Sequence, residues 1–182
     1  MPDLILEHAA TVQRAATLFG QLSTEQINWK PAPDKWGVGL CLEHLIVTDN
    51  TYRPLFASIL AGTYSPALWT RISPFSAWFG RWLVREMGAT VNKPIESPAA
   101  FRPQPTKVMP STQVAEYVKH GMEMNHLLAQ LAATDTKVCI PSPAMALITY
   151  PLADCIELMV KHHARHMAQA ERAMLLPGFP KA

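Results

Sequence analysis

Residues 151–170 read PLADCIELMVKHHARHMAQA, and this stretch decides the fold. Apolar residues and histidines return every three or four positions along it, which is the period of an α-helix. One face of that helix carries Leu152, Cys155, Met159, His162 and His166. Proline suits the first position of a helix, and the Pro-Gly pair at residues 177–178 ends the pattern. The sequence therefore predicts an amphipathic helix over about residues 151–176, with two histidines on its inner face.

Three further segments have the same apolar period, and none of them alternates as a strand does. The additional predicted helices cover residues 3–22, 38–60 and 111–133. Pro54 lies inside the second of them and is expected to bend or split it, because proline removes a backbone donor. Residues 146–150 have some β propensity, but they are too short and solitary to form a sheet. We expect an all-α protein, a four-helix bundle.

Composition narrows the functional classes. A chain of 182 residues suits one domain, here residues 1–182. With 16 Lys and Arg against 14 Asp and Glu, the net charge of +2 offers no basic surface for nucleic acid. No apolar run reaches the roughly 18–20 residues of a membrane span, and the first residues lack the pattern of a secretory signal. The three cysteines form no CxxC pair, so we expect a reducing, cytoplasmic setting.

Residues 62–111 form a long insert between the second and third predicted helices, and they hold seven of the 16 prolines. Within the insert, residues 75–87 predict a short helix with an aromatic stripe. The stripe consists of Phe75, Trp78, Phe79, Trp82 and Leu83. Our interpretation is that this stripe packs on the protein's own core. The alternatives are a homodimer interface and a roof over a pocket.

Histidines carry the strongest chemical signal. His162 and His166 are four residues apart, which places both imidazoles on one face of a helix, one turn apart. Two nitrogens at that distance can share one divalent cation. The alternative is a metal-free pair that is hydrogen-bonded or half exposed. For a third ligand His44 is the best candidate, and His8 also lies on the inner face of its helix.

The remaining histidines and several acidic residues are expected to lie outside the candidate metal site. His163 belongs to a different stripe and is expected to face a neighbouring helix or solvent. His120 and His126 are expected on the surface or on the flank of their helix. Asp49 and Tyr52, one to two turns beyond His44, are candidates for lining a pocket. Glu43 is expected on the surface, pointing away from His44, and Glu157 is not expected to face inward, so no general base stands out.

Three stretches together give the chain a family resemblance. Residues 29–38 read WKPAPDKWGV and are followed by LEHL at residues 42–45, residues 151–154 read PLAD, and residues 162–169 read HHARHMAQ. In this order they resemble the motifs of the DinB-like (YfiT-like) superfamily of metal-dependent proteins. Gly37 departs from the pattern, since the family often has a small hydroxyl residue there as a helix cap.

The resemblance implies a four-helix bundle with a long connection between its second and third helices. It also implies a metal site with His44, His162 and His166 as ligands and Gln169 fixing a histidine. The implied cofactor is a divalent transition metal (Zn, Ni or Fe), among which three imidazoles do not choose. Relatives are similar to metal-dependent hydrolases and to transferases or isomerases that use a low-molecular-weight thiol.

Three hypotheses follow. The first is a metal-dependent enzyme acting on a small molecule, either by transfer or isomerisation with a low-molecular-weight thiol or by hydrolysis. The second is a non-catalytic bundle that binds a metal or another ligand. The third is a metal-free scaffold in which the histidines satisfy one another. No membrane and no nucleic acid is expected as a partner, and a homodimer is the expected assembly if the aromatic insert is an interface.

Overall fold

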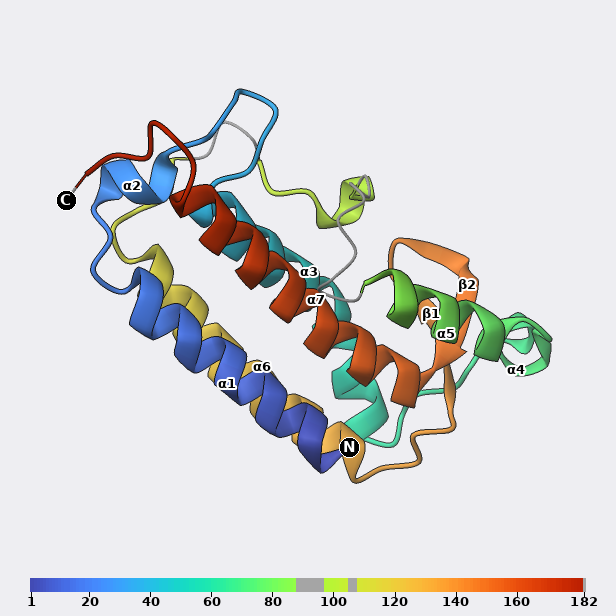
Figure 1. Cartoon of the computed structure of the whole chain (residues 1–182). Coiled ribbons are helices and arrows are strands. Elements are labelled where there is room, and N and C mark those ends of the chain that lie inside the picture. The colour runs from blue at the N-terminus through green and yellow to red at the C-terminus, as the bar shows by residue number, and fades with distance from the viewer. Residues whose placement is uncertain (88–96, 105–107, 182) are drawn as a thin grey trace.

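Four long helices form the body of the protein in the computed structural model, which describes residues 1–87, 97–104 and 108–181. They are α1 (Pro2–Phe19), α3 (Val38–Leu60), α6 (Gln113–Ala132) and α7 (Leu152–Met174). Helix α1 packs against α6 and α7, and α3 packs against the same two helices, so the four lie side by side as a bundle (Figure 1). The expected all-α bundle is confirmed, with helix ends within a few residues of the predicted ones.

The apolar core of this bundle is divided into two clusters. One, around Phe19, Leu45 and Tyr117, lies towards the end of α1 and the start of α3 and α6. The other, around Phe56 and Met159, lies towards the end of α3 and the start of α7. Polar side chains occupy the level between them, and they form the network described with the site below.

A β-hairpin precedes α7 and corrects the sequence prediction. Strand β1 (Cys139–Ser142) pairs antiparallel with β2 (Met145–Pro151), and Ile140 lies opposite Tyr150. The expectation that residues 146–150 are too solitary to pair is wrong. Their partner β1 is only four residues long and contains Pro141, so it has no alternating pattern that a sequence search can detect. Ile140 and Tyr150 are buried in the second cluster, and this contact stabilises the short hairpin.

The described residues of the insert form three short helices: α4 (Leu68–Ile72), α5 (Ser76–Glu86) and the 3₁₀ helix η1 (Ala99–Phe101). Figure 1 shows α4, α5 and the hairpin together at one side of the bundle. Residues 88–96 and 105–107 of the predicted insert lie outside the described part of the chain. In the described part, no helix combines the length and the apolar character that crossing a membrane requires.

Helix α5 forms where an aromatic helix was expected, but it presents a different face to the core. Its buried residues are Ser76, Gly80 and Val84, which face β2 and α7. At Gly80 a Cβ atom would collide with the Asp154 carboxylate, so glycine lets α5 approach α7 closely. Trp78 is exposed. The expectation that the whole aromatic stripe packs on the core is therefore wrong.

Pro54 does not split α3, contrary to one of the two expected outcomes. The helix runs unbroken from Val38 to Leu60. Pro54 is exposed, so the carbonyl that lost its backbone donor faces water, where it can be hydrated.

Gly37, the departure from the family pattern, has a steric cause. It is the N-cap of α3 in an extended conformation and makes no side-chain cap. A Cβ atom built on Gly37 would collide with the carbonyl oxygen of Trp29. The loop backbone thus passes so close to the start of α3 that only glycine fits.

Gly37→Ser tests this cause. Serine is the better N-cap by a few tenths of a kcal/mol, but the steric overlap costs about 1–3 kcal/mol. We expect a lower urea midpoint than in the wild type, and a similar loss for Gly37→Ala, which adds the same Cβ without the hydroxyl. A Gly37→Ser protein as stable as the wild type would contradict the close approach.

Candidate metal centre

Helices α3 and α7 bring three histidines together. One nitrogen each of His44, His162 and His166 lies within 4.8 Å of the other two, and Nε2 of His44 is 3.0 Å from Nε2 of His162. His44 is buried, and the other two are half-buried. These are the three residues that the motif comparison nominated, and we refer to them as the triad.

Two triad residues have their Nδ1 atoms engaged by hydrogen-bond acceptors. His44 donates from Nδ1 to the Phe101 carbonyl oxygen at 2.6 Å, and His166 donates from Nδ1 to Gln169 Oε1 at 3.0 Å. An acceptor at Nδ1 fixes the tautomer and leaves the Nε2 lone pair free, the arrangement common among metal-bound histidines. Gln169 was nominated by the sequence. The Phe101 contribution was missed, because a backbone carbonyl leaves no mark in a sequence.

His162 directs one of its two nitrogens at His44 and buries the other. Its Nδ1 is buried and has no hydrogen-bond partner. Without an ion, His162 must donate from Nε2 to the His44 lone pair, and its own Nδ1 lone pair is then buried and unsatisfied, which is costly. With an ion between the rings, all three Nε2 lone pairs can be donated to it, while Nδ1 of His162 then carries the ring proton and is still buried without a partner. The set of three imidazole nitrogens within 4.8 Å of one another fits a divalent transition metal.

The pKa values of the triad suit the same role. Burial lowers the pKa of His44 to about 4. Burial and the neighbouring imidazoles hold the pKa values of His162 and His166 well below the usual range. All three rings are therefore neutral at pH 7, and their lone pairs are available without loss of a proton. The Trp36 ring, 4.9 Å from the His44 ring and 5.8 Å from the His166 ring, covers one side of the triad.

Asp49, Tyr52 and His8, the residues predicted to line a pocket, form hydrogen bonds away from the triad. Asp49 is fully buried and accepts hydrogen bonds from His163 and His120. His8 pairs with Asn125, and its ring lies 4.6 Å from that of His163. Tyr52 bonds the hydroxyl of Tyr150 at 2.6 Å. None of the hydrogen bonds described for Asp49, Tyr52 and His8 involves the triad.

His163, His120 and Tyr117 complete a buried network that the sequence did not reveal. The Tyr117 hydroxyl donates to His163 Nδ1 at 3.1 Å, and His163 Nε2 donates to Asp49. Arg53 donates to His120 Nδ1 at 3.4 Å, and His120 Nε2 donates to Asp49 at 2.9 Å. His163 thus faces neighbouring helices, one of its two expected positions. Of the two positions expected for His120, surface or flank, the surface position is wrong, since its side chain is only 11% exposed.

Asp49 is an ionised carboxylate at the centre of this network. Burial by itself raises the pKa of Asp49, but His163 and His120 outweigh it and bring the pKa down to about 2. The two imidazole donors therefore replace the water that the carboxylate lost on folding.

The two glutamates near the histidines in sequence have structural partners. Glu43 was expected on the surface, but it is buried and accepts a hydrogen bond from Gln113. Glu157 forms ion pairs with Arg81 and Lys161. Neither of these contacts brings a carboxylate to the triad.

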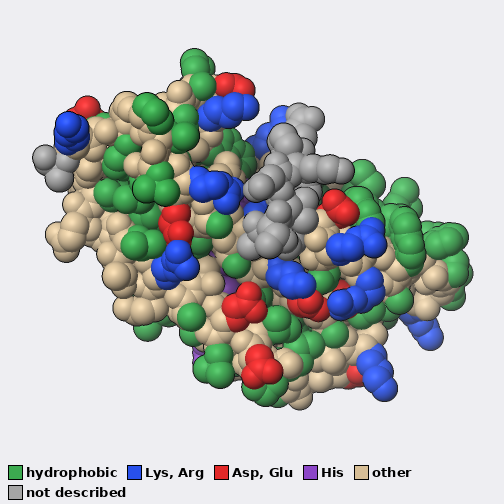
Figure 2. Space-filling model, in the orientation of Figure 1, with side chains coloured by type: hydrophobic (Ala, Val, Ile, Leu, Met, Phe, Trp, Pro, Cys, Tyr) green, Lys and Arg blue, Asp and Glu red, His purple; other side chains and the backbone are tan. Residues whose placement is uncertain are grey.

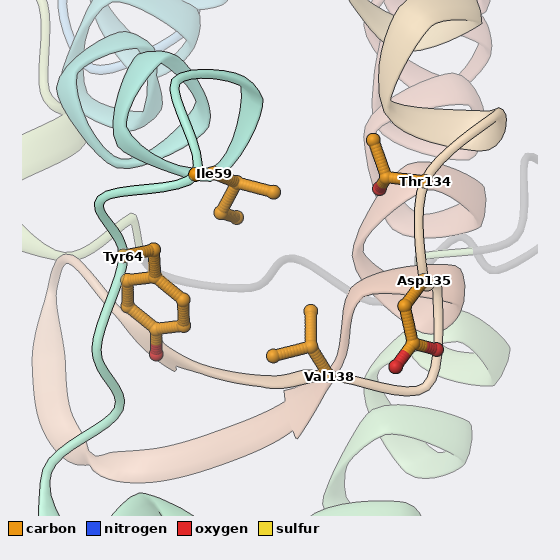
Figure 3. Close-up of a pocket in the computed structure, with 6 residues that line it drawn as sticks. Ile59, Tyr64, Thr134, Asp135 and Val138 are labelled. Atoms are coloured by element: carbon orange, nitrogen blue, oxygen red, sulfur yellow. The ribbon is translucent and has the colours of Figure 1, made fainter.

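A cavity of about 220 Å³ lies between the end of α3 and the hairpin (Figure 3). It is lined by Ile59, Gly62, Tyr64, Thr134, Asp135 and Val138. Two of its polar side chains are already hydrogen-bonded within the protein: the Tyr64 hydroxyl donates to the Cys139 carbonyl, and the Asp135 carboxylate accepts from the Lys137 amide. This cavity is smaller than the ~300 Å³ of small ligand sites, and no triad residue lines it.

His8 predicts an acid-sensitive fold. Burial lowers the pKa of His8 to about 3. The unfolded chain takes up a proton near pH 6.5 that the folded chain refuses until about pH 3, so stability is full above pH 6.5 and is lost on acidification. In urea titrations between about pH 6.5 and 4, we expect the free energy of unfolding to fall less steeply with acidification in His8→Gln than in the wild type. The difference in slope is expected to be up to about 1.4 kcal/mol per pH unit.

The control for this prediction is His126→Gln, which removes an exposed histidine from α6. It should follow the wild-type pH profile. Parallel profiles for the wild type and His8→Gln would mean that folding does not hold His8 neutral.

Gln169 provides a test of how His166 is oriented. Gln169→Leu removes the acceptor at Nδ1, so we expect zinc affinity to fall about 10–100-fold in a chelator competition. Gln169→Glu keeps an acceptor and should restore the affinity. Gln130→Leu, at an exposed position of α6, is the control, and equal affinities for all variants would show that the hydrogen bond does not tune the site.

Comparison with known proteins identifies the family. A family model described as the DinB superfamily matches residues 7–170. That range contains the whole triad and nearly all of the four long helices. No curated protein and no solved structure matches the chain. The resemblance drawn from the sequence motifs is confirmed: the chain belongs to the DinB superfamily.

Proposed function

We propose that the protein is a metal-dependent enzyme that acts on a small molecule through the His44, His162 and His166 triad. The reaction is one of two kinds. It is either a transfer or isomerisation that uses a low-molecular-weight thiol, or a hydrolysis. The observation that carries the proposal is the set of three neutral imidazoles within 4.8 Å, with Nδ1 of His44 and His166 bound to acceptors. Such a set binds Zn, Ni or Fe and leaves further positions on the ion open.

A bound ion at such a site acts as a Lewis acid and lowers the pKa of an adjacent thiol or water. The protein's own residues do the rest. The Phe101 carbonyl and Gln169 orient two of the ligands, and the Trp36 ring shields one side from water. None of the triad's hydrogen bonds in the described part of the chain goes to a carboxylate. Ligation by neutral groups leaves the ion's charge uncompensated, which favours an anionic fourth ligand such as a thiolate.

The second candidate is a non-catalytic bundle that binds a metal or another ligand. It is favoured by one observation: the carboxylates of Glu43, Asp49 and Glu157 have partners away from the triad.

The same observation bears on the two possible reactions, because a hydrolase needs a base near the reacting water. Thiol transfer needs none once the thiolate has formed, so we favour it over hydrolysis.

Subcellular location and domain extent are parts of the same proposal. The three cysteines are free thiols in the structure, which supports a reducing, cytoplasmic setting. We also propose that residues 1–182 act as a single domain.

Metal analysis tests the site. Protein purified without a histidine tag is expected to contain a stoichiometric divalent metal, and His44→Ala and His162→Ala are expected to lose it because two imidazoles bind far more weakly than three. His126→Ala is the matched control. Metal-free wild-type protein that cannot be loaded, together with unchanged stability of His162→Ala, would count against the triad as a metal site.

A thiol assay separates the enzyme from the binding protein. We expect thiol-dependent loss of an electrophile such as chlorodinitrobenzene or maleylpyruvate, abolished by His44→Ala and kept by His126→Ala. A chromogenic ester tests hydrolysis in parallel. Metal-loaded protein without either activity would favour the non-catalytic bundle, and activity indifferent to His44→Ala would remove the triad from catalysis.

A further inference from the structure

The outer side of the insert carries an apolar surface, which we call the α4–α5 face. It consists of Leu68, Trp69, Ile72, Phe75, Trp78 and Trp82, all exposed. On one side of the molecule Figure 2 shows hydrophobic side chains gathered over the region of α4 and α5. Single exposed apolar residues are common on protein surfaces, but a continuous run of this kind marks an interaction site.

Helix geometry shows that this exposure is built into α5. Its buried positions Ser76, Gly80 and Val84 form one side of the helix. Trp78 and Trp82, four residues apart, lie on the opposite side and are 62% and 39% exposed. Small residues therefore face the protein and the largest residues face outward, the reverse of what an isolated protein needs.

The area is large enough for a protein interface. Trp69, Phe75, Trp78 and Trp82 are 43%, 56%, 62% and 39% exposed, so at ~200 Å² per aromatic side chain they leave about 400 Å² in contact with water. Leu68 and Ile72 add to it. A standard interface buries about 800 Å² on each partner, so the α4–α5 face supplies its apolar centre.

Two of the aromatic rings on this face, those of Trp69 and Trp78, have contacts within the protein. The Trp69 indole N–H donates to the Leu147 carbonyl of the hairpin at 3.0 Å. The Trp78 ring packs edge-on against Phe79, with centroids 5.0 Å apart. Rigid tryptophans that lose little side-chain freedom on binding are the typical anchors of protein interfaces.

The charges beside this face indicate what kind of partner it fits. Arg81 is paired with Asp154 and Glu157, and Arg85 lies 3.8 Å from Glu86. Arg71 adds a single cation at the end of α4. An anionic bilayer or nucleic acid is recognised by several uncompensated cations, whereas a near-neutral apolar face can meet an identical face without repulsion.

We propose that the α4–α5 face binds a second copy of this chain in a two-fold homodimer. In such a dimer the same patch serves both subunits, so the near-neutral border and the outward tryptophans of each copy meet their counterparts. The inference is independent of the proposed chemistry, because the six residues belong to no part of the triad or of its hydrogen bonds.

Sedimentation equilibrium of the full chain tests the dimer. The wild type is expected to dimerise. Trp78→Glu and Trp82→Gln are each expected to weaken association at least tenfold, because they place a polar group in the centre of the contact. The control is Leu6→Glu on α1, where the replaced side chain is 69% exposed, and it should associate like the wild type. Circular dichroism and metal content establish that each variant is folded.

Two results would overturn the proposal. One is a wild type that stays monomeric at the highest soluble concentration. The other is a dimer that neither tryptophan variant weakens, which would place the interface on another face. Vesicles of phosphatidylcholine, with and without phosphatidylserine, test the competing partner: Trp78-dependent binding of a monomer to them would assign the face to a lipid surface instead.

Discussion

The buried carboxylate of Asp49 sets the register of the bundle. An ionised group without water must be met by donors, and here they come from α7 through His163 and from α6 through His120. A shift of either helix by one residue would take away one of the two donors of the carboxylate, so the network favours one register of α6 and α7 relative to α3. His162 is the neighbour of His163 on α7, and Asp49 lies little more than one turn beyond His44 on α3. The same two helices therefore carry the network and the triad, and the alignment that satisfies the carboxylate also brings the triad histidines together.

The insert has two functional sides. Its inner side touches both helices that carry the triad: the Phe101 carbonyl accepts from His44 on α3, and the Glu86 carbonyl accepts from Arg165 on α7, next to His166. Phe101 is in turn stacked on Tyr52, with ring centroids 6.0 Å apart, so η1 is anchored to α3 beside the triad. The outer side carries the exposed tryptophans. A segment that looks like an appendage in the sequence thus supplies a hydrogen-bond acceptor to the triad as well as the α4–α5 face.

Periodicity was sufficient to predict the four long helices, because a buried stripe repeating every 3.6 residues leaves a clear pattern. The triad was within reach because His162 and His166 share a helical face. Three features were out of reach for physical reasons. The hairpin depends on a partner strand with no pattern of its own, and the hydrogen bond to His44 comes from a backbone carbonyl. In α5 the periodicity identified an aromatic stripe, but an amphipathic pattern does not say whether its apolar side faces the protein or a partner. Gly37 was noted as a departure, and only the path of the Trp29 backbone explains it.

The contact between His44 and His162 joins residues 118 positions apart. The insert, α6 and the hairpin all lie within the loop that this contact closes. An ion held at both ends would act as a reversible cross-link, since it restricts the unfolded chain much as a disulfide does and adds its binding free energy to folding. A reducing compartment removes disulfides as a means of stapling so long a loop. A coordinated ion can serve there instead, so metal supply would control how long the protein persists as well as what it can do.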